Sequence, residues 1–288
     1  MTLLQYLKLI FRVMRPRLVF IHLAGYMIFG SKILGENNNF WFWYNLFLVL
    51  IPYSVVIYGI NDVYDYDTDI KNPRKQQNWL GSILQKEHQI IIMRSVIGSA
   101  LFIMGSAILS QNVNLILTYL VMLIFGIIYS MPPIKLKTKP FFDVIANVFI
   151  FGLILFVPMT SSPDYLQFII SKSPLITTIA GFYILAALVD YQTDKDCGDS
   201  TVATKLGLFW TPILIALLVS FRPIFYPFGN NILNYTILSI AFASGSLIFF
   251  QNTKLYNKLV STIINIIFLI AIVSLAVTGF SNIISRYS

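Results

Sequence analysis

Long apolar blocks alternate with short polar segments along this chain. A bilayer core of roughly 30 Å needs about 20 consecutive apolar residues in a helix, and several blocks reach that length. The blocks lack the period-2 alternation of a barrel strand, and lipid leaves the backbone no hydrogen-bonding partner except itself. The pattern therefore predicts an all-α, multi-pass transmembrane bundle of about nine helices, near residues 17–35, 41–61, 90–110, 113–131, 141–160, 174–190, 206–222, 232–250 and 259–280.

A separate amphipathic pattern occupies the first 16 residues. Its apolar positions fall at helical spacing, at Leu3, Leu4, Leu7, Phe11 and Met14. Lys8 and Arg12 interrupt the apolar run and no small-residue cleavage site follows, so the segment does not match a signal peptide. We expect residues 1–16 to form an interfacial amphipathic helix. Because no linker or low-complexity segment divides the chain, a single membrane domain over residues 1–288 is expected.

The composition and the distribution of basic residues agree with this prediction. Charged residues make up only 11% of the chain, against about 25% in typical soluble domains. Basic residues tend to remain on the cytoplasmic side of membrane segments. With a cytoplasmic N-terminus, sixteen of the twenty Lys and Arg residues fall on that side, and the exceptions are Lys32, Lys172, Arg222 and Arg286. We therefore expect a cell-membrane protein whose N-terminus and polar motif loops are cytoplasmic. The net charge of +8 then lies at the rims of membrane helices and requires no nucleic-acid partner.

Carboxylates are concentrated in two short segments. The chain has twelve acidic residues, and eight of them form two clusters, namely Asp62, Asp65, Asp67 and Asp69, then Asp190, Asp194, Asp196 and Asp199. Like charges at the end of an apolar helix repel one another and lose hydration, so such clusters are costly unless a cation compensates them. The alternative for any single aspartate is a solvated helix end. Two clusters of the same kind favour bound metal.

Helical geometry separates the members of each cluster. At 100° per residue, Asn61, Asp62, Asp65 and Asp69 lie within about a 100° arc of one helix face, whereas Asp67 points elsewhere. Asp190 and Asp194 share a face, while Asp196 and Asp199 are expected in a loop next to Gly198. Asp67, Asp196 and Asp199 are therefore better explained as solvated charges. A few carboxylate oxygens close to a phosphate suit Mg²⁺.

A third polar element lies between Tyr129 and Lys139, on the same expected side of the membrane. Pro132 and Pro133 end an apolar helix, and three lysines follow. Lysine is a good phosphate ligand, so we expect Lys135 and Lys137 to contact a diphosphate, whereas the positive-inside bias is enough to explain Lys139. Arg74 and Lys75 follow the first acidic cluster and have a similar claim.

These motifs together resemble the UbiA superfamily of intramembrane prenyltransferases. Asn61-Asp62-Val63-Tyr64-Asp65-Tyr66-Asp67-Thr68-Asp69 has that family's N-D-x-x-D-x-x-x-D pattern. Asp190-Tyr191-Gln192-Thr193-Asp194 resembles its D-x-x-x-D motif, and Thr201–Gly207 its usual continuation. The resemblance extends from Arg15-Pro16 through the double proline to Gly207.

The resemblance implies a helical bundle around a central cavity open to lipid, in which Mg²⁺ is held on a prenyl diphosphate. Departure of the diphosphate would leave an allylic cation for attack by the acceptor. The implied metal ligands are Asp62, Asp65, Asp69, Asp190 and Asp194. The implied diphosphate ligands are Asn61, Arg74, Lys75, Lys135 and Lys137, and the residues expected to act in catalysis are Asp65, Asp190, Lys135 and Tyr129.

The acceptor is less closely specified. Members that prenylate aromatic rings often continue the first motif with an Arg-Pro stretch ending in Ser-Gly, which is absent here. The stretch Asp65–Lys75 looks more like the branch that adds a C5 unit from dimethylallyl diphosphate to a carotenoid such as lycopene. Gln76 and Gln77 replace the glycines that often follow in that branch, so an aromatic quinone precursor or a lipid acceptor remains open. Prenyl chain length, quenching of the final cation and oligomeric state are also open.

Two other classes of function fit the sequence less well. A cation or proton transporter would carry acidic residues near the bilayer midplane. Here the two clusters sit at span ends. Of the four other acidic residues, Asp143 lies within an expected span, and Glu36, Glu87 and Asp164 lie between spans. A non-catalytic assembly subunit would need neither the acidic clusters nor the lysines. The enzyme is therefore favoured.

Overall fold

The computed structural model describes residues 1–30, 39–70, 85–229, 231–251 and 255–270. These residues form helices joined by turns, and the described part of the chain contains no β-strand. The described residues divide into two compact units. Unit 1 comprises those of Met1–Lys135 and Phe149–Tyr165, and unit 2 comprises those of Leu136–Val148 and Leu166–Ile270. The predicted all-α class is confirmed.

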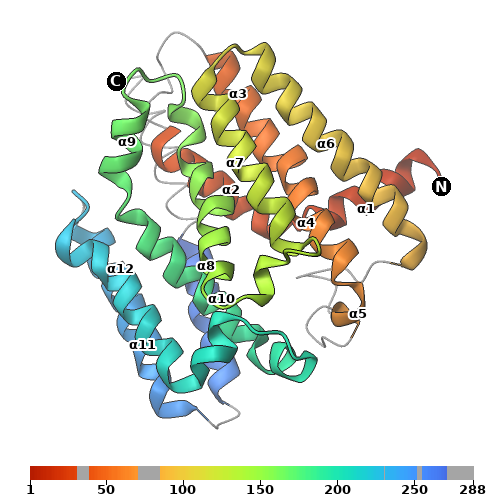
Figure 1. The fold of residues 1–288 in the computed structure, drawn as a ribbon. Helices are drawn as coiled ribbons and strands as arrows, with labels where there is room; N and C mark the ends of the chain where they lie inside the picture. The colour runs from red at the N-terminus through yellow and green to blue at the C-terminus, as the bar shows by residue number, and fades with distance from the viewer. Residues whose placement is uncertain (31–38, 71–84, 230, 252–254, 271–288) are drawn as a thin grey trace. The chain divides into compact units, whose positions relative to one another are not determined.

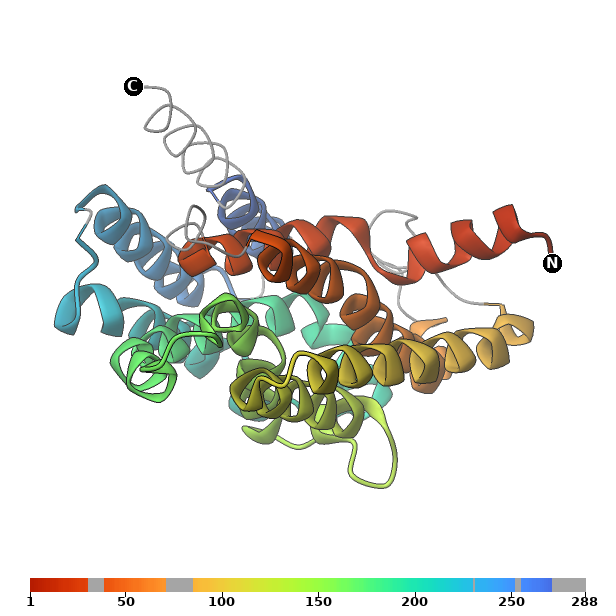
Figure 2. The same cartoon turned by 90° about the horizontal axis from the view of Figure 1, so that it is seen from above.

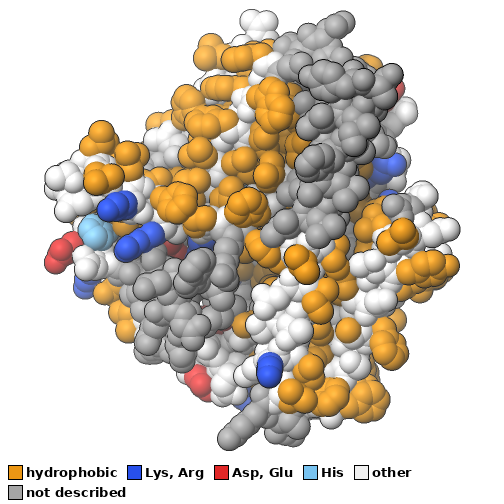
Figure 3. All heavy atoms as spheres, turned by 180° about the vertical axis from the view of Figure 1, so that it is seen from behind, with side chains coloured by type: hydrophobic (Ala, Val, Ile, Leu, Met, Phe, Trp, Pro, Cys, Tyr) orange, Lys and Arg blue, Asp and Glu red, His pale blue; other side chains and the backbone are white. Residues whose placement is uncertain are grey.

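The predicted membrane spans are present as apolar helices. Within the described ranges, six helices are long and apolar enough to cross a membrane: Phe40–Tyr64, Lys86–Leu109, Val113–Ser130, Leu175–Cys197, Val202–Phe225 and Asn231–Phe250. Three shorter apolar helices, Leu18–Met27, Phe142–Leu155 and Leu255–Ile270, coincide with the other three predicted blocks. Figure 3 shows hydrophobic side chains along the outward sides of the helices, with the charged ones gathered at a few places. The protein is a multi-pass membrane protein.

Unit 1 contains seven of the labelled helices among its described residues: α1 (Leu3–Val13), α2 (Pro16–Gly30), α3 (Asn39–Leu48), α4 (Ser54–Tyr64), α5 (Tyr66–Asp69), α6 (Gln89–Leu109) and α7 (Val113–Ser130) (Figure 1). A π-helical turn at Val49–Tyr53 joins α3 to α4 in one span. Pro52 explains this turn, because proline has no N–H and its ring displaces the carbonyl of the preceding turn.

Helix α4 packs closely against its neighbours because small residues face them. A Cβ placed on Gly59 would lie 2.7 Å from Val96 Cγ2 of α6, and one on Gly126 of α7 would lie 3.1 Å from Ile57 Cγ2. The first distance is too short for a methyl group unless Val96 shifts, and the second is tight, so the two glycines favour the close approach of these helices. Helix α4 carries the first acidic cluster at its end and is thereby fixed in the middle of unit 1.

The predicted amphipathic helix is present as α1. A capping box between Thr2 and Gln5 starts it, and Val13 is buried near its end. Its apolar positions Leu3, Leu4, Leu7 and Phe11 are more than half exposed, as an interfacial helix requires. Figure 2 shows α1, in red, leading from the N-terminus into α2.

Unit 2 is built around two long helices. Its labelled elements are α8 (Phe142–Asn147), α9 (Tyr165–Lys172), α10 (Leu175–Cys197), α11 (Val202–Phe225) and α12 (Asn231–Ser246), and Figure 1 shows α11 beside α12. Leu185 and Leu188 of α10 pack with Ile215 and Val219 of α11 in its core. Gly181 permits the contact, since a Cβ there would lie 2.5 Å from Val219 Cγ2.

Two details of the predicted helices were wrong, one an interruption and the other a helix end. The block at 141–160 is not one continuous α-helix, because α8 passes into a π-helical turn at Val148–Gly152 and then into 3₁₀ turns at Leu153–Leu155 and Val157–Met159. Pro158, which cannot donate a backbone hydrogen bond, lies in the last of these turns. Asp196 lies in helix α10 rather than in a loop, since the helix continues to Cys197 and stops only at Gly198, whose φ of 76° is left-handed.

Candidate functional site

The first acidic cluster lies where α4 ends. Asp62, Asp65 and Asp69 are only 2%, 4% and 6% exposed, whereas Asp67 is exposed. The helix is not continuous as predicted, because Asp65 has φ −103° and ψ 5° and separates α4 from α5. The one-turn spacing survives this break, since Asp65 N–H donates to Asn61 O at 2.9 Å and Asp69 N–H donates to Asp65 O at 2.8 Å. Burial thus separates Asp62, Asp65 and Asp69 from Asp67, which is the division that helical geometry predicted from the sequence.

Arg15 compensates part of this buried charge. Its Nη2 lies 2.6 Å from Asp62 Oδ1, and the two side chains are 15% and 2% exposed. Burial disfavours the charged guanidinium, but the neighbouring charges of Asp62 and Asp69 help to raise the pKa of Arg15 above its ordinary value. Arg15 therefore stays protonated at any physiological pH.

The backbone of Arg15 is strained. Its φ of 52° is left-handed, a conformation that costs a non-glycine residue about 1–3 kcal/mol unless its surroundings impose it. The residue lies between the end of α1 and Pro16, the first residue of α2. The ion pair with Asp62 and the ring of Tyr58, 5.0 Å from the guanidinium carbon, hold the side chain in place.

A buried chain of polar groups continues from Tyr58. Its hydroxyl lies 3.1 Å from His22 Nε2, and His22 Nδ1 lies 3.2 Å from Ser54 Oγ. His22 is 2% exposed, and both of its ring nitrogens have partners, so it is structural. These contacts join α2 to α4 directly behind the cluster. Sequence reasoning missed the partnership of Arg15 with Asp62, although an arginine at the start of an apolar block was a signal.

The carboxylates of the first cluster suit Mg²⁺ only when other ligands complete its coordination. Within the described residues, no group of three or more His, Cys, Asp or Glu side chains is placed to hold a metal by itself. Mg²⁺ usually takes one or two carboxylates and completes its octahedron with water and substrate phosphates. Oδ2 of Asp62 is buried and has no hydrogen-bond partner among the described residues, so it is an available anionic ligand. The cluster fits an ion that is shared with a diphosphate.

The second acidic cluster lies in unit 2. Asp190 and Asp194 are partly buried in the last turns of α10, whereas Asp196 is exposed and accepts a hydrogen bond from Gln192 Nε2 at 2.8 Å. Asp196 therefore satisfies its charge locally, as predicted for a solvated residue.

Asp143 fixes the connection that follows this cluster. The side chain is fully buried in α8, and its Oδ2 accepts hydrogen bonds from Val202 N–H at 2.9 Å and from the Tyr183 hydroxyl at 3.4 Å. Tyr183 belongs to α10 and Val202 begins α11, so Asp143 joins both helices. Sequence reasoning missed this role. An isolated aspartate inside an apolar block was the available signal.

The stretch Thr201–Gly207, which resembles the family's usual continuation of the second motif, has a structural explanation. Thr201 caps α11 in a capping box with Thr204, and Gly207 has φ 74° and ψ 178° at a kink in the helix. A side chain would strain position 207, because this backbone conformation is open chiefly to glycine.

The structure brings only some of the remaining candidates together. Ser130 Oγ donates to Asn61 Oδ1 at 3.4 Å and so joins the end of α7 to the first cluster. Tyr129 is partly buried in the last turn of α7, and Lys135 follows with a left-handed φ of 42°. Lys137 is partly buried in the 3₁₀ turn Leu136–Thr138 of unit 2. Arg74 and Lys75 lie outside the described residues.

Comparison with known proteins gives one family and one fold. The sequence pattern of the UbiA prenyltransferase family matches residues 18–273. A lycopene elongase/hydratase of Corynebacterium glutamicum is 32% identical over 187 residues, a match that spans 62% of either chain and thus less than two thirds of that protein. A lycopene elongase/hydratase of Haloarcula japonica is 29% identical over 219 residues, which cover 72% of this chain and 68% of that protein.

The solved structures share the fold. A UbiA homolog from Archaeoglobus fulgidus bound to DMAPP and Mg²⁺ matches with a TM-score of 0.64, covering 93% of this chain and 99% of that one, at 18% identity. This likeness supports the helical membrane architecture.

Replacing Arg15 by Gln should lower the free energy of unfolding by about 3 kcal/mol, because it leaves the carboxylate of Asp62 buried without its partner. Adding Asp62→Asn to Arg15→Gln should recover at least half of that loss. Unfolding of the purified protein in detergent measures both, and Arg12→Gln, which removes an exposed arginine of α1, should change little. A double variant no more stable than Arg15→Gln alone would show that the ion pair does not determine this region's stability.

Proposed function

The chain belongs to the UbiA prenyltransferase family, and from this premise we propose that it transfers a prenyl group from a prenyl diphosphate to a hydrophobic acceptor in the membrane. One observation carries the proposal. Three carboxylates are buried at the end of an apolar membrane helix, one is paired with an arginine, and a carboxylate oxygen of that pair is left without a hydrogen bond in the described residues. Such an arrangement stabilises a cation and the anion that the cation carries.

In the proposed reaction, the bond between C1 of the prenyl group and the diphosphate oxygen breaks, and its electron pair leaves with the diphosphate. A double bond of the acceptor supplies the electrons for the new carbon–carbon bond. The resulting cation then loses a proton or takes up water. Bound Mg²⁺ would supply charge stabilisation to the departing diphosphate. Its proposed ligands are Asp62, Asp65 and Asp69 in the first motif and Asp190 and Asp194 in the second.

The protein's other groups complete the proposed chemistry. Lys135 and Lys137, with Arg74, Lys75 and the amide of Asn61, bind diphosphate oxygens and so lower the energy of the leaving group. The ring of Tyr129 stabilises the allylic cation through its π face.

For the acceptor we propose a carotenoid such as lycopene, which receives a C5 unit from dimethylallyl diphosphate. The stretch Asp65–Lys75 favours this branch, and the relatives named lycopene elongase/hydratase support it. An aromatic quinone precursor is the alternative acceptor. For the location we propose the cell membrane, with the N-terminus and motif loops cytoplasmic, from the sixteen-to-four division of basic residues.

Asp65→Asn should reduce prenyl transfer about a thousandfold, because it keeps the size of the side chain but removes a charge that a divalent ion needs. Stabilisation of a leaving group by metal supplies several kcal/mol, and each 1.36 kcal/mol is about tenfold in rate. Asp67→Asn, at an exposed position of the same motif, should cost much less. Diphosphate release at equal expression measures both variants, and equal activity of the two would contradict the assignment of the first cluster.

Expression in a lycopene-producing host should convert the pigment to C45 or C50 species, since one or two C5 units would be added. Chromatography with mass spectrometry of the extracted pigment reads this directly. The Asp65→Asn variant is the control for pigment changes unrelated to the site. An unchanged pigment, together with prenylation of a quinone precursor in the same membranes, would show that the acceptor is aromatic rather than a carotenoid.

A cysteine placed at Asn78, in the segment after the first motif, should react with an impermeant maleimide only after the membrane is opened. Cys197 is first replaced by Ser to remove the natural thiol. A second cysteine at Gln111, between α6 and α7, should show the opposite accessibility. Labelling of position 78 in intact cells would mean that this segment faces the outside, opposite to the proposed orientation.

A further inference from the structure

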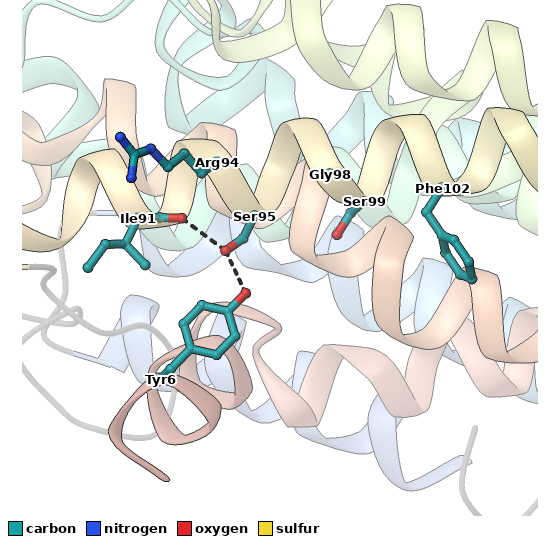
Figure 4. A pocket seen from close by; sticks show the side chains of 7 residues that line it. All are labelled: Tyr6, Ile91, Arg94, Ser95, Gly98, Ser99 and Phe102. Carbon is teal, nitrogen blue, oxygen red and sulfur yellow. Dashed lines mark hydrogen bonds between the residues drawn. The ribbon is translucent and has the colours of Figure 1, made fainter. Parts of the chain in front are cut away.

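A groove in unit 1 lies outside the proposed site. It has a volume of about 480 Å³ and is formed by one face of α6 together with Tyr6 of α1 (Figure 4). On α6 its lining includes Ile91, Arg94, Gly98 and Phe102, which recur every three or four residues and so share one side of the helix. At 1.5 Å per residue, positions 91 to 102 extend over about 16 Å, a length that accommodates much of an acyl chain.

The groove changes from polar to apolar along the helix. At one end, the hydroxyl of Tyr6 lies 2.9 Å from Ser95 Oγ, which itself donates to Ile91 O at 2.9 Å (Figure 4). Arg94 is exposed beside this pair. At the other end lies Phe102, deeper in the apolar helix Lys86–Leu109. A ligand that fits has a charged head and an apolar tail.

Arg94 offers an exposed positive charge to an anion. It is exposed on a helix apolar enough to span the membrane, and within the described residues it forms no ion pair. A charged side chain on a lipid-facing surface is costly unless it reaches the interface or is paired. On the described segments that form the groove, 1–13 and 85–109, Lys8, Arg12 and Lys86 add positive charge and Glu87 is the one carboxylate. The charge favours an anion.

We propose that this groove binds an anionic glycerophospholipid, with its phosphate on Arg94 and an acyl chain running past Gly98 to Phe102. Arginine is suited to phosphate because its guanidinium donates two parallel hydrogen bonds. Anionic lipids are concentrated in the leaflet toward which basic residues are directed. The apolar half of the groove distinguishes a lipid from free phosphate.

Gly98 keeps the path for the acyl chain open. A Cβ placed on Gly98 meets no atom within 4 Å, so a larger side chain would enter the groove without disturbing the packing of α6. Gly105 lies on the same helix, also has no atom within 4 Å of an added Cβ, and does not line the groove. The two glycines therefore provide a blocking substitution and a matched control.

The test uses the full-length protein in detergent, mixed with phosphatidylglycerol or phosphatidylcholine of the same acyl composition, and counts the lipids that remain bound by native mass spectrometry. Five proteins are compared: wild type, Arg94→Gln, Gly98→Leu, and the controls Lys258→Gln, which removes an exposed charge of unit 2, and Gly105→Leu. Wild type and both controls should retain one phosphatidylglycerol. Arg94→Gln and Gly98→Leu should each weaken retention about tenfold, as loss of a charge-assisted hydrogen bond or of the chain's space would do.

Several results would overturn the proposal. Equal retention by Gly98→Leu and Gly105→Leu would mean that the groove is not occupied by the acyl chain. Equal retention of phosphatidylcholine and phosphatidylglycerol by wild type would remove the role of charge. Displacement of the bound lipid by glycerol phosphate at a similar concentration would assign the site to a free phosphate.

Discussion

The burial of carboxylates at the membrane edge is the constraint on which unit 1 depends. Asp62, Asp65 and Asp69 are nearly inaccessible, and removing the partner of one buried charge typically costs 3–5 kcal/mol. Arg15, whose backbone is left-handed, supplies one compensating charge. Tyr58, His22 and Ser54 then connect that arginine to the helices behind it. One oxygen of Asp62 is left for a further cation, so the same constraint that threatens stability creates a site for a metal and its diphosphate.

Unit 2 uses a buried carboxylate differently. Asp143 is compensated by hydrogen bonds from Val202 and Tyr183 rather than by a basic side chain. Because these donors belong to α10 and α11, the carboxylate fixes the short connection after Asp190 and Asp194. Gly198 ends the first of these helices and Thr201 begins the second. Each acidic motif is thus accompanied by a buried carboxylate with a partner from a distant segment.

The sequence predicted the features that repeat along the chain. Apolar block length located the membrane helices, and the 100° helical angle separated buried Asp62, Asp65 and Asp69 from exposed Asp67. It did not predict the interruptions at Asp65, 49–53 and 148–152, because helical periodicity carries no information about a local change of backbone hydrogen bonding. Pro52 was an available signal for the turn at 49–53. The partners of Arg15 and Asp143 were missed for a related reason, since they lie 47 and 59 residues away. Periodicity in a sequence shows which residues share a helix face, whereas contacts between residues far apart in the sequence become visible only in the folded structure.

In the proposed mechanism the first cluster binds a prenyl diphosphate through a divalent cation. Binding of dimethylallyl thiodiphosphate, an analogue whose leaving group departs slowly, tests it by equilibrium titration of the purified protein with Mg²⁺ or with EDTA. The account predicts binding at least about tenfold tighter with Mg²⁺, and loss of that difference in Asp62→Asn, since each 1.4 kcal/mol of metal-mediated attraction is a factor of ten. Equal affinity with and without Mg²⁺, or an undiminished Mg²⁺ effect in Asp62→Asn, would contradict it.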